Sequence, residues 1–193
     1  KGDGTMKVSR GARTLLYPTP VLVVGTYDAE GKPNVAVAAW GGICCSRPPA
    51  IQVSFRKATY THGNIVRGGA FTISVPSQSQ VKLADYFGLV SGRDTDKFAA
   101  TGLTPVRSDL VDAPYVAEFP LVLECKILHI FDLGLHTQFV GEVVDVKADE
   151  EVLDEAGMPD ILKVLPIIFS PGSQVYYGVG ASLGHAFAVG KEI

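Results

Sequence analysis

Runs of apolar and aromatic residues alternate along the chain with short clusters of Gly, Pro, Asp and Asn. Runs rich in Val, Ile and aromatic side chains, bounded by turn-forming residues, are typical of β-strands. The polar segment 28–33 joins the first two runs and offers Gly31 for a positive φ, as a hairpin loop requires. The pattern predicts antiparallel strands over residues 20–27, 34–40, 50–55, 70–75, 119–131 and 137–146, with two further candidates at 166–169 and 174–179.

Helical periodicity is sparse by comparison. Apolar residues recur at i, i+3 and i+4 within residues 80–88, and shorter helical signals cover residues 61–67 and 94–100. About six long strands with alternating faces favour a closed antiparallel barrel, because closure removes exposed strand edges. We therefore expect a mainly β fold with a few short peripheral helices.

Residues 102–118 carry Pro105, Pro114 and scattered acidic residues, and they predict a loop. Loops of this length are uncommon in compact domains unless they have a function. A lid or a partner contact is one interpretation of this segment, and a plain linker is the other.

The composition narrows the class of protein. An apolar fraction of 47% with 19% charged residues excludes disorder for most of the 193 residues, because such a chain can bury enough apolar surface to offset its ordering entropy. The length suits one domain, which we expect to span residues 6–193, with residues 1–5 as an appendage outside it.

Charge and hydropathy also limit the partners. A net charge of −3 without a long basic run argues against a nucleic-acid partner, since such binding depends on clustered Lys and Arg. The sequence lacks an apolar run of about 18 residues and an apolar leader, which predicts no membrane partner and a cytoplasmic location.

The cysteines and histidines do not predict a metal site or a disulfide. Cys44, Cys45 and Cys125 are odd in number and match no zinc or disulfide spacing, so reduced thiols fit best. A bridge between Cys44 and Cys45 would need a strained backbone, because adjacent Cα atoms are only about 3.8 Å apart. The histidines are scattered, and His136 stands at the entry of the strand 137–146, where its ring could face a pocket or the solvent.

The densest polar cluster covers residues 54–64, where a predicted strand leads into a predicted helix. Arg56, Lys57, several hydroxyls and the free N–H groups of a helix start would together favour an anion such as phosphate. A solvated strand end with an ordinary Thr N-cap explains the same residues. No nucleophile elbow, P-loop or paired-carboxylate pattern occurs, so any chemistry is expected to come from a cofactor.

Five blocks of residues, taken in order, resemble the flavin-reductase-like, FMN-binding split-barrel family. The resemblance extends from about residue 15 to the end of the chain, and it implies a Greek-key antiparallel split barrel, a homodimer, and FMN held without a covalent link near the dimer interface. The blocks are TPVLVVGT (19–26), AAWGGICC (38–45) with Pro48 and Pro49, RKATY (56–60), SGRD (91–94) with DKF (96–98), and HTQFVGEV (136–143).

The resemblance also implies which residues bind FMN. The flavin-contacting strand end corresponds to Ala39, Trp40 and the backbone of Gly41, Gly42, Ile43, Cys44 and Cys45. The phosphate-binding turn corresponds to Ser54, Arg56, Lys57, Thr59 and Asn64, with Lys97 adding charge. This turn coincides with the anion-binding cluster that the residues themselves indicate.

His136 is the candidate catalytic residue by the same resemblance. The family's reductases usually carry Gly-Asp-His before the strand that contains Gly-Glu-Val, and that histidine lies close to the flavin and the nicotinamide site. Here Gly134-Leu135-His136 keeps the histidine without its acidic neighbour, which favours electron transfer over turnover of NAD(P)H.

The resemblance therefore implies an FMN-binding flavoprotein that carries electrons, with a redox protein or NAD(P)H as its partner. Two alternatives stay open. One is an NAD(P)H-dependent flavin reductase that supplies reduced flavin, and the other is a barrel that binds a small molecule without redox chemistry.

Overall fold

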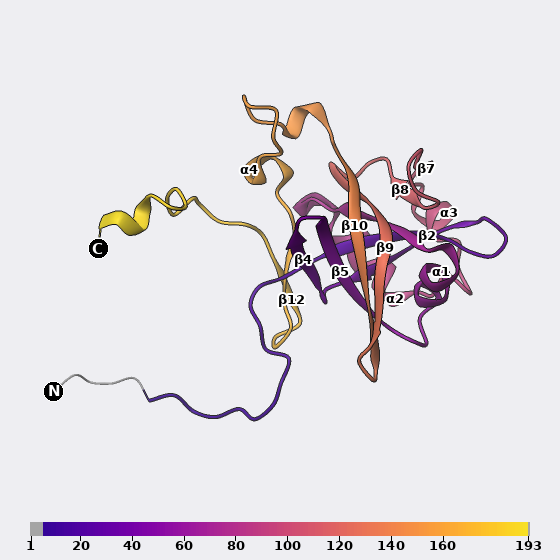
Figure 1. Cartoon of the computed structure of the whole chain (residues 1–193), viewed down its shortest axis with the longest axis horizontal. Coiled ribbons are helices and arrows are strands. Elements are labelled where there is room, and N and C mark those ends of the chain that lie inside the picture. Colours follow the sequence, from indigo (N-terminus) through magenta and orange to yellow (C-terminus); the bar gives the residue numbers. More distant parts are fainter. Residues whose placement is uncertain (1–5, 193) are drawn as a thin grey trace.

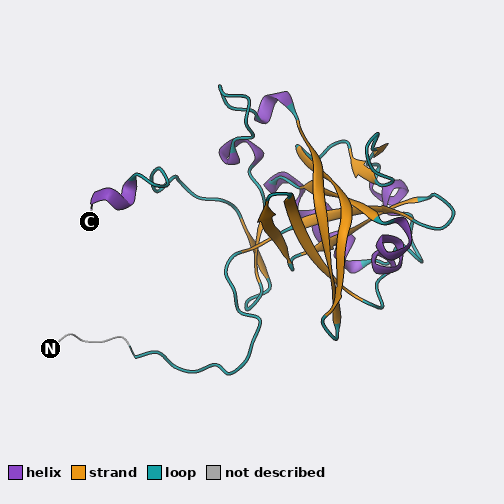
Figure 2. Cartoon of the chain, viewed as in Figure 1, coloured by secondary structure: helices purple, strands orange, loops and turns teal. Residues whose placement is uncertain are grey.

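The computed structural model describes residues 6–192, and its largest sheet is antiparallel with seven strands (Figures 1 and 2). The order of its strands is β3-β2-β6-β9-β10-β5-β4, and the sheet curls so that β3 approaches β5. The strands are β2 (Leu22–Tyr27), β3 (Pro33–Ala38), β4 (Gly41–Ser46), β5 (Pro49–Arg56), β6 (Ala70–Val75), β9 (Leu121–Asp132) and β10 (His136–Ala148).

Smaller elements surround this sheet. A three-stranded sheet joins β1 (Thr19–Pro20), β11 (Ile168–Ser170) and β12 (Val175–Tyr177), and a short hairpin joins β7 (Pro105–Arg107) and β8 (Pro114–Val116). The helices are α1 (Tyr60–Gly68), α2 (Val81–Leu89), α3 (Lys97–Thr101) and α4 (Ile161–Val164), with the 3₁₀ turns η1 (Gln78–Gln80), η2 (Glu150–Val152) and η3 (Val189–Glu192). Within residues 6–192, no helix has the length and apolar character needed to cross a membrane.

The predicted fold class, a mainly β antiparallel split barrel with a few short peripheral helices, is confirmed. All six long predicted strands are present, and their boundaries differ from the predicted ones by at most about two residues. The boundaries of β6 agree with the prediction. The pattern missed β4, because this edge strand is built of small and polar residues and is largely exposed. Its pairing with β5, from Gly41 opposite Val53 to Ser46 opposite Pro49, holds it in the sheet.

β2 is buried on both faces, which explains its continuous apolar sequence. Leu22 and Val24 contribute to the core inside the barrel, where Phe71 and Phe139 are fully buried. Val23 faces the opposite way, into a second core beneath α2 and α3. Because successive side chains of a strand point to opposite faces, β2 stabilises both layers at once.

The predicted loop 102–118 is a packed part of the barrel wall. The Thr72 hydroxyl donates a hydrogen bond of 2.5 Å to the Pro114 carbonyl, and the Val116 N–H donates to the Ser74 hydroxyl at 3.2 Å. β8 therefore lies directly against β6 and β2. A Cβ at Gly25 of β2 would stand 2.0 Å from the Pro114 carbonyl oxygen, so only glycine allows this approach.

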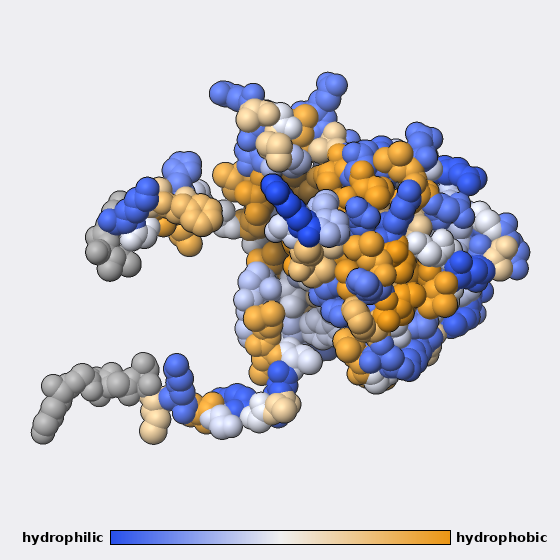
Figure 3. All heavy atoms as spheres, viewed as in Figure 1, coloured by the Kyte–Doolittle hydropathy of each residue, from blue (hydrophilic) through white to orange (hydrophobic). Residues whose placement is uncertain are grey.

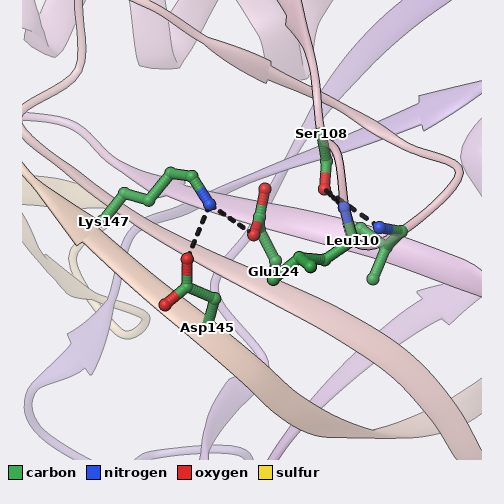
Figure 4. A network of polar contacts seen from close by, with 6 residues as sticks. Ser108, Leu110, Glu124, Asp145 and Lys147 are labelled. Carbon is green, nitrogen blue, oxygen red and sulfur yellow. Dashed lines mark hydrogen bonds and ion pairs between the residues drawn. The ribbon is translucent and has the colours of Figure 1, made fainter.

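A polar network ties β9 to β10 on the same side of the barrel (Figure 4). The buried carboxylate of Glu124 accepts a hydrogen bond of 2.6 Å from the Lys147 ammonium, which also bonds Asp145 at 2.6 Å. Burial opposes the charge on Lys147, but these two carboxylates raise its pKa to about 12. The Ser108 hydroxyl accepts the N–H of Leu110 nearby and shapes the turn between β7 and β8.

The close approach of β8 to β2 predicts that alanine substitutions at two glycines change the free energy of unfolding in opposite directions. Gly25→Ala lowers the free energy of unfolding by about 1–3 kcal/mol, because the backbone carbonyl of Pro114 cannot move without displacing the hairpin. Gly63→Ala, on an exposed position of α1 with open space around it, raises stability by about 0.5–1 kcal/mol. Urea unfolding of both variants tests this, and equal effects would show that β8 is not held against β2.

Candidate functional site

A cleft lies between the end of β3, the end of β5 and the small sheet β1-β11-β12. Its volume is about 330 Å³, and we call it the main cleft. It is lined by Val21, Val37, Ala38, Ala39, Trp40, Ser54, Phe55, Arg56, Thr59, His136, Phe169 and Tyr176.

The polar end of the main cleft is formed by the turn from β5 into α1. Thr59 is the N-cap of α1, since its hydroxyl accepts the His62 N–H at 3.3 Å and donates to the Arg56 carbonyl at 2.9 Å. His136 begins β10 directly opposite Arg56 on β5. This end therefore combines a guanidinium, a hydroxyl, an imidazole and a helix start, which are groups that bind anions.

The opposite end of the main cleft is mainly apolar. Val21, Phe169 and Tyr176 come from elements far apart in the sequence. The Tyr176 hydroxyl donates to Asp85 at 2.9 Å, and burial together with this carboxylate raises the pKa of Tyr176 to about 12. The cleft thus presents charge at one end and rings and aliphatic side chains at the other, with Trp40 among its walls.

A second chamber of about 560 Å³ adjoins the main cleft and shares the residues Ala39, Trp40, Ser54 and His136 with it. The Ser54 N–H donates to the Trp40 carbonyl at 2.8 Å, which fixes the bend between β3 and β4 at this shared wall. Residues 13–16 and Leu133 line the far side of the second chamber, together with Thr19, Gly41 and Gln52.

A third pocket of about 350 Å³ lies behind the β5–α1 turn and shares Val37, Phe55 and Thr59 with the main cleft. Lys97 lines it and is only 3% exposed, and its ammonium donates to the carbonyls of Val35 and Phe87, both at 2.8 Å. Burial lowers the pKa of Lys97 to about 8. No carboxylate within the described part of the chain pairs with it, so this ammonium has only neutral oxygen partners.

Arg93 lies at the same third pocket. Its guanidinium donates to the Ala58 carbonyl at 2.9 Å and lies 5.6 Å from the centre of the Tyr60 ring. Asp96, three residues further along the chain, does not pair with Arg93. Asp96 instead caps α3 by accepting the Ala99 N–H and pairs with Lys32 at 3.2 Å, so it is engaged elsewhere.

The structure brings about half of the predicted site residues to one place. The main cleft contains Ala39, Trp40, Ser54, Arg56, Thr59 and His136, while Gly41 lies in the second chamber and Lys97 in the third pocket. Four of the predicted residues line none of these three pockets: Gly42, Ile43, Cys44 and Cys45. They continue along β4, where Ile43, Cys44 and Cys45 are exposed.

Two predicted phosphate-binding residues lie away from the cleft. Lys57 forms an exposed ion pair of 2.5 Å with Asp132 at the end of β9. Asn64 is buried on the inner side of α1, where its amide donates to the Thr26 hydroxyl at 3.2 Å and accepts from Arg67 at 2.9 Å. Both side chains are already satisfied by other partners.

The sequence analysis missed the apolar residues of the main cleft that lie far away in the chain. Val21, Phe169 and Tyr176 meet because β1 pairs with β11, which places Thr19 opposite Phe169 and Phe169 opposite Tyr176. No local pattern indicates this pairing, since each of the three strands has only two or three residues.

Comparisons with known proteins agree on the family. A family model described as a flavin reductase like domain matches residues 13–175. Flavoredoxin of Desulfovibrio vulgaris (Miyazaki F) is a similar solved structure, with 57% sequence identity, a TM-score of 0.92, and an alignment that covers 96% of this chain and 100% of that one. The flavoredoxin structure from Methanosarcina acetivorans has 30% identity and a TM-score of 0.87, and covers 98% of each chain.

The chain is also similar to a curated protein. The high molecular weight rubredoxin of Moorella thermoacetica is 32% identical over 149 residues, which are 76% of this chain and 58% of that protein. The family match spans most of the chain and includes every residue of the main cleft except Tyr176. This chain therefore belongs to the flavin reductase like family of split barrels.

Proposed function

We propose that this chain is a flavoprotein that binds FMN without a covalent link in the main cleft and carries electrons through it, as the name flavoredoxin implies for its similar structures. The observation that carries the proposal is the polarity of the cleft. Arg56 and Thr59 stand at one end, and Trp40 with apolar side chains forms the rest. A phosphate monoester joined to a large planar ring has the same distribution of charge.

Arg56 and the N-cap residue Thr59 are the groups that would hold the phosphate. Lys97 and Arg93 add positive charge from the third pocket behind the same turn. A buried ammonium without a carboxylate partner is costly, and an anion close to it offsets that cost. Of the predicted cations, Lys97 therefore gains most from a bound phosphate.

The flavin ring belongs at the shared wall of Ala39 and Trp40. The isoalloxazine supplies the redox chemistry when it is bound. The chain contributes a small side chain at Ala39 and a fixed bend after β3, which leave room for a planar ring beside Trp40. His136 stands between the main cleft and the second chamber and would contact the ring from the phosphate side.

We also propose a homodimer in the cytoplasm, with a redox protein as the physiological partner. The edge strand β4 supports the homodimer, because its Ile43 is 70% exposed and follows directly on the flavin wall. In a dimer the residues 43–45 would be covered, close to the cleft. The free thiols of Cys44, Cys45 and Cys125 support a reducing compartment.

An NAD(P)H-dependent flavin reductase is the second candidate, and the second chamber favours it. This chamber is large enough for a second ligand and touches the same Trp40 and His136 as the main cleft. A nicotinamide in it would lie against the flavin wall.

Anaerobic reduction separates these candidates. We expect purified protein to be yellow, to release FMN on denaturation at about one per chain, and to be bleached completely by dithionite but only slowly by NADH or NADPH. Rapid bleaching by a nicotinamide at catalytic rates would favour the reductase. A colourless protein that takes up no FMN from solution would overturn both candidates and leave a barrel that binds another small molecule.

Arg56 and Lys57 form a matched pair for testing the phosphate site. Arg56→Ala removes a charge-assisted contact of about 1.5–3 kcal/mol, so the Kd for FMN should rise about tenfold or more. Lys57→Ala should change it by less than threefold, because Lys57 pairs with Asp132 outside the cleft. Quenching of Trp40, the single tryptophan, reports the binding. Equal effects of the two variants would remove Arg56 from the site.

Lys97 predicts a pH dependence of FMN binding. Burial holds its pKa at about 8, below the ordinary 10.5, so the ammonium is present at pH 7 and is lost as the pH rises above 8. A bound phosphate favours the charged form, so the Kd for FMN should increase by up to about tenfold per pH unit above pH 8. Titrations at pH 7 to 9.5 test this.

Two controls isolate the contribution of Lys97. The variant Lys97→Met should bind FMN more weakly at pH 7 and show a flatter pH profile. Riboflavin, which has the ring without the phosphate, should bind the unaltered protein with little dependence on pH in this range. A profile that is the same for FMN and riboflavin would separate Lys97 from the phosphate.

A further inference from the structure

Both ends of the described chain leave the body on the same side (Figure 1). We call residues 6–14 the N-terminal arm and residues 180–191 the C-terminal arm. Their roots are anchored to the small sheet, where a Cβ at Gly172 would meet the side chains of Tyr17 and Leu15, and where Gly178 lies against Gln78. Beyond these roots, every described residue of both arms is exposed.

The C-terminal arm ends in a hook that displays apolar side chains. The His185 carbonyl accepts the N–H groups of Ala188 and Val189 at 3.2 and 3.1 Å, so the hook has a defined shape. Leu183 and Phe187 are nevertheless each 96% exposed. Phe187 also has a φ of 61°, in the left-handed region that bulky residues avoid, and no contact within its own chain compensates for it.

The alignment with a similar protein includes parts of both arms. The alignment to the flavoredoxin structure from Methanosarcina acetivorans covers 98% of this chain at 30% identity. Two per cent of 193 residues is about four residues, fewer than either arm contains, so the alignment extends into both arms. Both arms therefore have counterparts in a distant relative.

The body offers a matching surface at the far end of β9 and in the turn that follows. The second half of β9 is exposed on both of its faces, although it contains Leu, Ile and Phe. Figure 3 shows apolar side chains gathered over the middle of β9 and β10, next to this end. The exposed apolar residues of this projecting end lie on both of its faces, and together we call them the receiving surface: Leu128, Ile130, Phe131, Leu133 and Leu135.

We infer that the hook of one copy, with Leu183 and Phe187, packs onto the receiving surface of a second copy, and that the second copy does the same in return. Each chain carries one hook and one receiving surface, so a two-fold pair covers both and leaves none exposed. Figure 1 shows the C-terminal arm projecting clear of the body, which leaves its hook free to reach a second copy.

This exchange would complete the cofactor site. Leu133 of the receiving surface also lines the second chamber, where it lies with His136. The hook of the partner subunit therefore covers the open side of that chamber. The inference rests on the homodimer proposed above and adds the segment that forms it.

The double variant Leu183→Ser/Phe187→Ser tests the inference. Because both side chains are exposed within one chain, these substitutions leave an isolated copy intact. We expect them to raise the dimer dissociation constant at least thirtyfold in analytical ultracentrifugation and to lower the midpoint of thermal unfolding at low protein concentration. Lys191→Ser, on the same arm, is the matched control and should behave like the unaltered protein.

A second variant addresses the receiving surface. Leu133→Ser/Leu135→Ser should weaken the dimer as strongly, and combining all four substitutions should add little, because both pairs remove one contact. A dimer that survives both variants unchanged would overturn the arm exchange and leave the homodimer standing, whereas a monomeric unaltered protein would overturn both. The FMN content of the unaltered protein, measured in parallel, reports on the cofactor proposal separately.

Discussion

The pairing of β10 with its two neighbours is the constraint on which the cleft depends. β10 spans 13 residues and pairs with β9 along one edge and with β5 along the other. The β5 register sets His136 opposite Arg56, and the N–H of Ser54, from the same strand, holds the Trp40 carbonyl. Arg56, His136 and the bend at Trp40 are thus held by the β5–β10 strand pair rather than by flexible loops.

The cationic side chains near the cleft differ in whether a carboxylate balances their charge, and this decides which of them a bound anion would stabilise. Lys57 has an acidic partner at the surface, so its charge is already balanced. Lys97 is enclosed and bonded only to carbonyls, so its charge is present at a cost. Arg56 lies at the cleft without an acidic partner among the described residues. An anion at this corner stabilises the two unbalanced cations and has little effect on the balanced one.

Most of the strands could be predicted from the sequence because they bury at least one face. A buried face requires apolar residues at regular positions, and these can be recognised in the sequence. The sequence also predicted an anion-binding turn because strand end, N-cap and cations are adjacent in the chain. It could not distinguish Lys57 from Arg56, since alternate residues at a strand end point to opposite sides and the partner Asp132 is 75 residues away. It missed β4, whose small and polar residues are held by their register with β5, and the contributions of Phe169 and Tyr176, which depend on tertiary pairing alone.

The order of the strands also bears on how fast the protein folds. β2 and β3 are close in the sequence and form a local hairpin. By contrast, β5 pairs with β10, which is about 85 residues further along the chain, and β1 pairs with β11 across about 150 residues. Contacts between such distant segments form slowly, because loop-closure entropy is lost before they are made. The cleft lies where these two late pairings meet, so a newly synthesised chain becomes competent for its ligand only in the last steps of folding.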